Sequence, residues 1–161
     1  MVRRPFLGLL LACSLAACGA KTLGEGEYGS GGRTAPAGPQ VVFPTIAVDV
    51  ELARTDAERA KGLGGHAPLA ERQGMLFLFE RPAIYPFWMK GMTFPLDIMW
   101  IEDGKVVHLE ADLPPPGPRD TDQTLPIFTP PAAARYVLEV NAGFSVRHGI
   151  GLGTPAELRG V

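Results

Sequence analysis

The stretch FWMKGMTFPLDI, residues 87–98, lies near the middle of the 161-residue chain and decides how the flanking segments are interpreted. It sets one lysine and one aspartate among aromatic, methionine and aliphatic side chains. A charge in such surroundings needs a partner or access to water, because burying it alone is costly. We therefore interpret Lys90 and Asp97 as either a structural polar pair or the centre of a site, with Arg59 and Glu139 as further candidate members of this polar centre.

Short apolar segments separated by turn signals surround this stretch. Residues 46–53 alternate between apolar and polar side chains, which is typical of a strand with one buried face. Asp103-Gly104 predicts a type I′ hairpin between two strand-like runs. The other predicted strands are residues 74–80, 95–102, 105–112 and 136–140.

Helical signals are few and short. Thr55 and Glu58 have the spacing of a capping box, and Gly62 is expected to end that helix. A second helical turn is predicted for residues 144–149. The sequence thus predicts a mainly β fold: a small antiparallel sandwich or barrel with one or two short helices.

Prolines and glycines predict where this pattern is broken. Arg81-Pro82 is expected to end the strand before it, and residues 85–92 are expected to form an irregular extended strand. Residues 113–124 carry four prolines and predict a long exposed loop. Long loops in compact domains are often functional.

The first residues have the pattern of an export signal. Arg3 and Arg4 precede a short apolar run, and the run ends in LAACG, residues 15–19. This resembles the bacterial lipobox, in which cleavage occurs directly before a cysteine that receives a lipid. We expect residues 1–17 to be a signal peptide and Cys18 to be the lipidated residue.

Residues 18–40 are predicted to be the lipidated cysteine and a flexible tether, and residues 41–161 a single β-rich domain. The tether is rich in glycine and proline, and about twenty such residues reach roughly 25 Å. The protein is therefore expected to be exported and lipid-anchored, with the membrane as its first partner. Gly19 follows the cysteine, which favours the periplasmic side of the outer membrane over the inner membrane.

Composition excludes several classes of function. The formal net charge is −2 and the chain has no basic run, so nucleic acid is not an expected partner. Of its two cysteines, Cys13 lies in the predicted signal peptide and Cys18 would carry lipid. The exported domain then has no thiol for catalysis, redox exchange or zinc binding.

The domain resembles a family known only as "domain of unknown function 192". The matching pieces are Glu58-Arg59, residues 74–77, residues 87–90, residues 95–98 and residues 136–139. The resemblance implies a small, mainly β barrel or sandwich in an often exported protein, and it implies no established activity. The family usually has methionine at the position of Gly64, and asparagine and threonine at positions 91 and 92.

The aromatic residues of the central stretch suggest a binding surface. Tyr85 and Trp88 are the candidate aromatic wall of a site, because both can keep a polar edge near solvent. The alternative is that the aromatic cluster simply belongs to the core.

The methionines suggest a metal alternative. Met89 and Met92, together with the imidazole of His66, would suit Cu(I). Against this, methionine also fills irregular cores, and strand alternation would place the two thioethers on opposite faces. Apart from this Cu(I) alternative, no cofactor is expected.

The first functional hypothesis is a membrane-tethered, extracytoplasmic binding domain for a small molecule, an envelope glycan or an envelope protein. The second is a hydrolase-like enzyme with Lys90 and Asp97 at an aromatic cleft, although the sequence assigns no catalytic residue. An enzyme of this kind should show a water-accessible cleft in which a charged residue meets a histidine or an acid with mutual hydrogen bonds.

Overall fold

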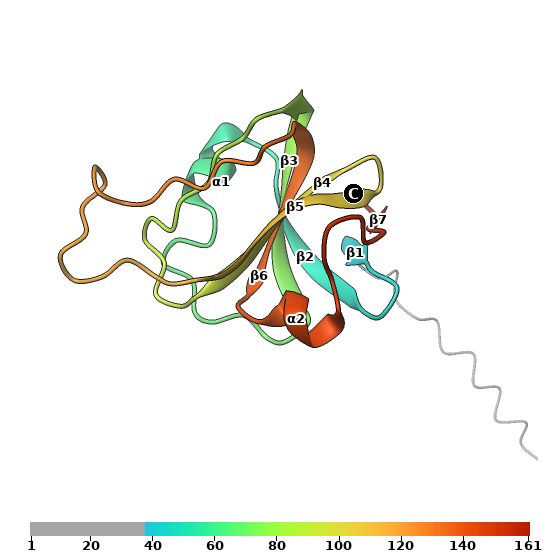
Figure 1. Cartoon of the computed structure of the whole chain (residues 1–161), viewed down its shortest axis with the longest axis horizontal. Helices are drawn as coiled ribbons and strands as arrows, with labels where there is room; N and C mark the ends of the chain where they lie inside the picture. The colour runs from blue at the N-terminus through green and yellow to red at the C-terminus, as the bar shows by residue number, and fades with distance from the viewer. Residues whose placement is uncertain (1–37) are drawn as a thin grey trace, which may run out of the picture. The chain divides into compact units, whose positions relative to one another are not determined.

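The computed structural model describes residues 38–161, and the predicted signal peptide, Cys18 and most of the tether lie outside the described residues. Seven strands and two short helices form the domain (Figure 1). Their bounds are β1 Gln40–Val42, β2 Ala47–Ala53, α1 Asp56–Lys61, β3 Gln73–Ala83, β4 Leu96–Glu102, β5 Lys105–Leu113, β6 Ala134–Asn141, α2 Phe144–His148 and β7 Glu157–Arg159. The predicted mainly β class with short helices is confirmed.

All seven strands belong to one curled sheet with the order β5-β4-β6-β3-β2-β1-β7. Neighbouring strands are antiparallel except β2 and β3, which are parallel. A parallel pair needs a crossover connection, and α1 lies in the segment that joins these two strands. The sequence had suggested a wholly antiparallel sheet, and the parallel pair β2–β3 corrects that prediction.

The helix that makes this crossover begins and ends as predicted. Thr55 Oγ1 accepts a hydrogen bond from the Glu58 amide at 3.2 Å, and Glu58 Oε2 accepts one from the Thr55 amide at 2.8 Å. This reciprocal pair is a capping box. Gly62 ends the helix with a φ of 49°, which is unfavourable for residues with a side chain.

The predicted hairpin is also confirmed. Asp103 and Gly104 connect β4 to β5 with φ angles of 49° and 69°. Positive φ at both central residues defines the type I′ turn, whose twist matches that of the paired strands.

Two local predictions are wrong. The strand β3 does not stop at Arg81-Pro82 but continues to Ala83, because its register with β6 shifts between Leu78 and Ala83 and so accommodates a proline. Residues 85–92 do not form a strand; they contain one isolated bridge, from Phe87 to Phe128, and a turn at Gly91.

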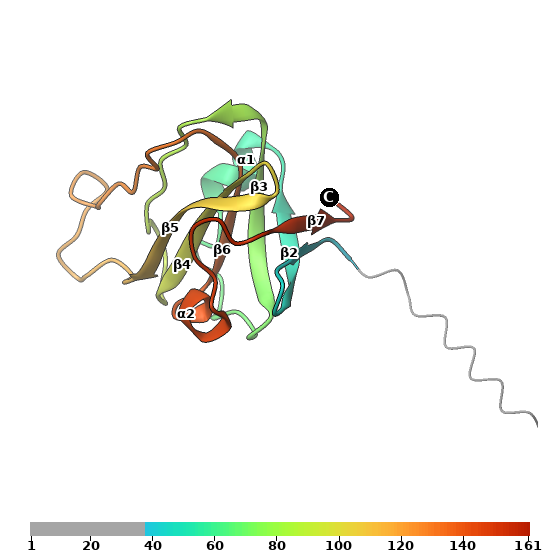
Figure 2. The ribbon, with the colours of Figure 1, turned by 45° about the vertical axis from the view of Figure 1, so that its right-hand side comes forward.

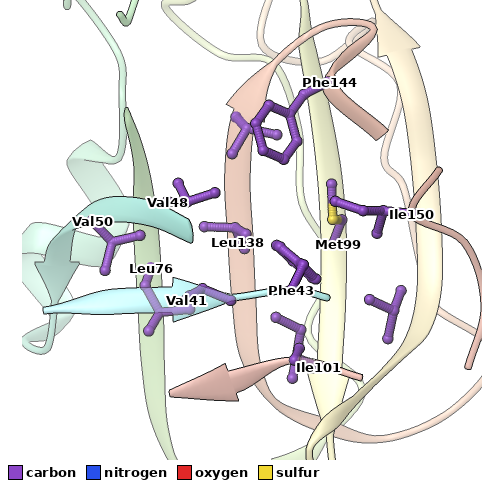
Figure 3. Packing of buried hydrophobic residues seen from close by; sticks show 13 residues of the cluster. Val41, Phe43, Val48, Val50, Leu76, Met99, Ile101, Leu138, Phe144 and Ile150 are labelled. Carbon is purple, nitrogen blue, oxygen red and sulfur yellow. The ribbon is translucent and has the colours of Figure 1, made fainter. Parts of the chain in front are cut away.

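Both faces of the central strands are buried, so successive side chains enter different apolar clusters. Leu76 and Leu138 point to a face that is covered by Phe43, Phe144 of α2 and Ile150, which we call the α2 face (Figure 3). Their neighbours Phe77 and Val137 point to the opposite face, which we call the α1 face. That face is covered by Leu63, Met89 and Phe94, from the turn after α1 and the β3–β4 connection.

The segment that precedes β7 connects the two edges of the sheet. The Val106 amide on β5 donates to the Thr154 carbonyl at 2.9 Å, and the Ala156 amide donates to the Gly104 carbonyl at 2.8 Å. The next residues form β7, in which Leu158 pairs with Val41 of β1. Figure 2 shows this segment passing from α2 across the β5 side to the β1 side.

The long loop between β5 and β6 contains no strand or helix from residue 114 to residue 133. The prolines predicted a loop over residues 113–124, whereas Leu113 still belongs to β5 and the loop continues to β6. It lies on the same side of the sheet as α1 in Figures 1 and 2. Within residues 38–161, neither helix has the length and apolar character needed to cross a bilayer.

Candidate binding pocket

Lys90 and Asp97 do not form a pair. Asp97 follows Leu96 on β4, and strand alternation directs its fully buried side chain to the α2 face. Lys90 precedes β4 on the α1 side, and its Nζ lies 2.5 Å from Asp122 Oδ2 in the long loop. The cleft proposed for a hydrolase therefore lacks one of its two charged residues.

The Asp97 carboxylate has a structural role that its surroundings define. Its Oδ1 accepts hydrogen bonds from the amides of Asp112 at 2.9 Å and Gly143 at 3.0 Å. Its Oδ2 accepts from the Ser145 amide at 2.8 Å and the Ser145 hydroxyl at 2.6 Å. The carboxylate thereby joins β4, the end of β5 and the start of α2.

A cavity of about 240 Å³ lies on the α1 face, and we call it the Glu139 pocket. Its lining comes from four parts of the chain: residues 59–64, Phe77 and Phe79 of β3, the 85–92 connection, and Glu139 of β6. Five predicted site residues line it in addition to Glu139: Arg59, Tyr85, Trp88, Lys90 and Met92. Asp97, Met89 and His66 do not.

Glu139 is the most buried charged residue of this lining, with 5% of its surface exposed. It lies between Leu138 and Val140, which face the α2 side, so its own side chain is directed to the α1 face. Its Oε2 has no hydrogen-bond partner among the described residues. Desolvation by burial raises the pKa of Glu139 to about 8. At neutral pH the carboxyl is therefore mostly protonated and offers an O–H donor.

Aromatic side chains form much of the remaining wall. Phe77 and Phe87 meet edge to face with ring centroids 4.9 Å apart, and Phe79 stacks on Tyr85 at 3.5 Å. The Tyr85 hydroxyl donates to the Arg81 carbonyl at 3.0 Å, so it is already occupied. Trp88 is 42% exposed, which is unusual for a large aromatic residue and consistent with a place at the mouth of the pocket.

Cationic side chains also line the pocket. Arg59 donates to the Leu78 carbonyl at 2.7 Å, pairs with Asp56, and lies 5.1 Å from the Phe79 ring centroid. Lys90 lies 5.0 Å from the Trp88 ring centroid in addition to its pairing with Asp122. The two cations are thus held in place by acidic partners outside the cavity.

The long loop is fastened beside the pocket at two places. Phe87 and Phe128 exchange backbone hydrogen bonds of 2.9 and 2.8 Å, and Asp122 pairs with Lys90. Phe87 and Lys90 both belong to the pocket lining, so the loop helps to hold this side of the pocket.

The three residues proposed to bind Cu(I) do not line one site. Met89 and Met92 are buried in the apolar cluster of the α1 face, where thioethers fill space. His66 lies 3.8 Å from Glu51 and lines a neighbouring cavity. No group of three or more His, Cys, Asp or Glu residues that could hold a metal occurs in the part of the chain that the structure describes.

Sequence reasoning missed part of the pocket. Phe77 and Phe79 appeared only as members of a strand, and Lys61 was not singled out. Glu139, by contrast, was among the sequence candidates, and its signal is the glutamate that interrupts the apolar strand YVLEV, residues 136–140. Gly64, at which the family resemblance expects methionine, also lines the pocket and contributes no side chain to fill it.

Among residues 38–161, a curled seven-stranded sheet carries a cavity with aromatic side chains in its lining and a buried glutamate whose Oε2 has no hydrogen-bond partner there. These features define a small β-domain protein with one buried acid at a cavity. The chain belongs to the domain of unknown function 192 family, described as an uncharacterised ACR, whose model matches residues 41–158. This confirms the family resemblance of the sequence.

Two solved structures are similar to this chain. One is a protein of unknown function from Novosphingobium aromaticivorans, which is 32% identical with a TM-score of 0.65, covering 74% of this chain and 82% of that one. The other is a putative transcription regulator from Sinorhizobium meliloti, 28% identical with a TM-score of 0.66, covering 76% of this chain and 93% of that one. The comparison with curated proteins gives no match.

Proposed function

We propose that this protein is an exported, lipid-anchored domain that binds a small molecule in the Glu139 pocket. The observation that carries the binding proposal is the buried Glu139 carboxyl in the lining of an aromatic cavity, where its Oε2 has no hydrogen-bond partner among residues 38–161. A buried polar group without a partner is costly, and a ligand that supplies the missing hydrogen bond recovers part of that cost. Convergent polar groups in an apolar cavity are typical of ligand sites.

The size of the cavity favours one of the three ligand classes considered from the sequence. A cavity of 150 Å³ accommodates benzene, so a cavity of about 240 Å³ suits a ligand of about ten non-hydrogen atoms. This is smaller than a disaccharide or a peptide segment. The transcriptional role in the description of the Sinorhizobium protein is not included in the proposal, because a formal net charge of −2 does not favour DNA binding.

The pocket is tested by blocking its mouth. Ala60 lies on α1, is exposed and lines the pocket, so Ala60→Trp is expected to fill the entrance without disturbing the core. A panel of neutral, anionic and cationic fragments of about ten non-hydrogen atoms is screened by ligand-observed NMR. Fragments that bind the wild type are expected to lose at least tenfold in affinity for Ala60→Trp.

Ala57→Trp is the matched control, because Ala57 is exposed on the same helix and is not part of the lining. It is expected to bind the same fragments with unchanged affinity. Fragments that bind both variants equally, or a panel in which no fragment binds the wild type, would contradict the small-molecule proposal.

The anchor is tested separately through the two cysteines of the chain, Cys13 in the predicted leader and Cys18 directly after it. Expressed in a bacterial host with an alkyne fatty acid, the wild type is expected to incorporate the label and to partition into the detergent phase. Cys18→Ala is expected to lose both properties, because its thiol is the proposed acceptor. Cys13→Ala, five residues earlier in the leader, is expected to keep them. Label that persists in Cys18→Ala would exclude the lipobox assignment.

A further inference from the structure

The ionisable groups around the Glu139 pocket are unequal in sign. Arg59, Lys61 and Lys90 contribute cationic side chains to the lining, and Glu139 is its only acid among residues 38–161. Asp56 and Asp122 pair with two of these cations from outside the cavity. Lys61 is exposed in the last turn of α1. Among residues 38–161, Lys61 is thus the one cation of the lining without an acidic partner, and the net positive charge of the rim is that of Lys61.

The buried carboxyl does not cancel this charge at neutral pH. Its pKa of about 8 leaves Glu139 mostly neutral, with one O–H donor and one acceptor. The side chains packed near it from β3 and β4 are Met75 and Ile98, which are its register partners and carry no charge. The other ionisable groups that face the same cavity are the three cations of the lining and the phenol of Tyr85, whose hydroxyl donates to the Arg81 carbonyl. The site is therefore a cationic rim above a neutral donor.

Resting on the function proposed above, we propose that the Glu139 pocket selects a small aromatic carboxylate with a hydrogen-bond-accepting oxygen at its far end. The ring lies against the aromatic wall formed by Phe77, Phe87 and Trp88. The carboxylate lies at the rim near Lys61 and Lys90, where it remains partly hydrated. The far oxygen accepts a hydrogen bond from the Glu139 O–H. Each part of the ligand thus meets a group of matching chemistry.

A cationic ligand fits less well for two reasons. It has to approach through the positive rim, and it has to ionise a carboxyl that burial keeps neutral. The two kinds of ligand have opposite pH dependence. A ligand that needs the Glu139 O–H weakens as pH rises, whereas an ammonium ligand that needs the carboxylate tightens.

Four matched probes separate these possibilities on the full-length, detergent-solubilised protein: 4-methoxybenzoate, 4-ethylbenzoate, 4-methoxybenzamide and 4-methoxybenzylammonium. The first has both the charge and the far oxygen, the second lacks the oxygen, the third lacks the charge, and the fourth reverses it. Isothermal titration at pH 7 is expected to give the tightest binding for 4-methoxybenzoate. Binding of 4-ethylbenzoate is expected to be at least fivefold weaker, because the Glu139 O–H is then left without a partner.

The pH profile identifies the group responsible. From pH 7 to pH 9 the wild type is expected to lose about tenfold in affinity for 4-methoxybenzoate. The reason is that the fraction of protein with a protonated Glu139, which is the form that binds, falls over this range. Glu139→Gln keeps a donor but cannot ionise, so its affinity is expected to stay constant over that range. Lys61→Gln is expected to weaken binding of the benzoate but not of the benzamide. Lys105→Gln, whose side chain lies outside the lining, is the control for loss of charge.

Tightest binding of the ammonium probe, affinity that rises with pH, or an unchanged pH profile in Glu139→Gln would overturn the carboxylate assignment. These outcomes leave the small-molecule function intact, provided that Ala60→Trp still weakens binding at least tenfold. Fragments that bind Ala60→Trp as tightly as the wild type, or a complete absence of binding to the wild type, would contradict both the small-molecule function and the carboxylate assignment.

Discussion

Replacing Asp97 with alanine is expected to lower the free energy of unfolding by about 3–5 kcal/mol, because it leaves two buried and two partly buried donors unpaired at once. Three backbone amides and the Ser145 hydroxyl donate to this carboxylate. One of the amides belongs to Asp112, which has a φ of 54° and lies where the β4–β5 register shifts. Without the Asp97 carboxylate, Asp112 loses the hydrogen bond that stabilises its left-handed backbone conformation.

Urea unfolding monitored by circular dichroism measures the loss, and Asp122→Ala is the matched control. Asp122 is also an aspartate in an ionic contact, but its side chain is 61% exposed. Exposed pairs contribute between 0 and about 1 kcal/mol, so that variant should remain close to the wild type. Equal stability losses in the two variants would show that the Asp97 network is not what holds α2 against the sheet.

Glu139→Gln is expected to stabilise the protein increasingly as pH rises. In the folded state the pKa of Glu139 is about 8, against an ordinary value of 4.5. The folded state therefore holds a proton that the unfolded chain releases between these two values, so the contribution of the wild-type side chain is intact below pH 4.5. It is lost by about 1.4 kcal/mol per pH unit as pH rises toward 8. Glutamine has no proton to release, which makes the variant more stable by roughly 3 kcal/mol at pH 7.

The measurement is the difference in unfolding free energy between Glu139→Gln and wild type at each pH from 4 to 9, since other titrating groups cancel in this difference. The difference should grow above pH 4.5 and become constant above pH 8. Glu80→Gln, on the exposed part of β3, is the control for the change of side chain. A difference that does not vary with pH would show that Glu139 is hydrated or paired in solution.

Local signals in the sequence predicted local structure well. The capping box at Thr55, the helix end at Gly62 and the hairpin at Asp103-Gly104 each depend on a few neighbouring residues whose backbone preferences are strong. The mainly β class followed from the same turn signals. The parallel pairing of β2 with β3 was not predictable in this way, because it depends on which distant strand lies alongside rather than on any neighbouring residue.

The interpretation of the central stretch failed for a geometric reason. Lys90 and Asp97 are close in sequence, yet the turn at Gly91 and the start of β4 direct them to opposite faces of the sheet. A one-residue change in strand register reverses the face of every side chain, so sequence distance alone could not decide whether they meet. Glu139 was among the candidates. That its Oε2 has no hydrogen-bond partner among the described residues depends on tertiary packing that covers both sides of β6, which the sequence does not show.

The segment that joins β5 to β1 constrains the order in which the protein can fold. Val41 and Leu158 are paired although they lie near opposite ends of the domain sequence. Contacts between such distant residues form late and slow the folding of β proteins. Under the export proposed above, both sheet edges would therefore stay open until the last strand has crossed the membrane. Late closure of this kind would keep the domain in a translocation-competent state for as long as export requires.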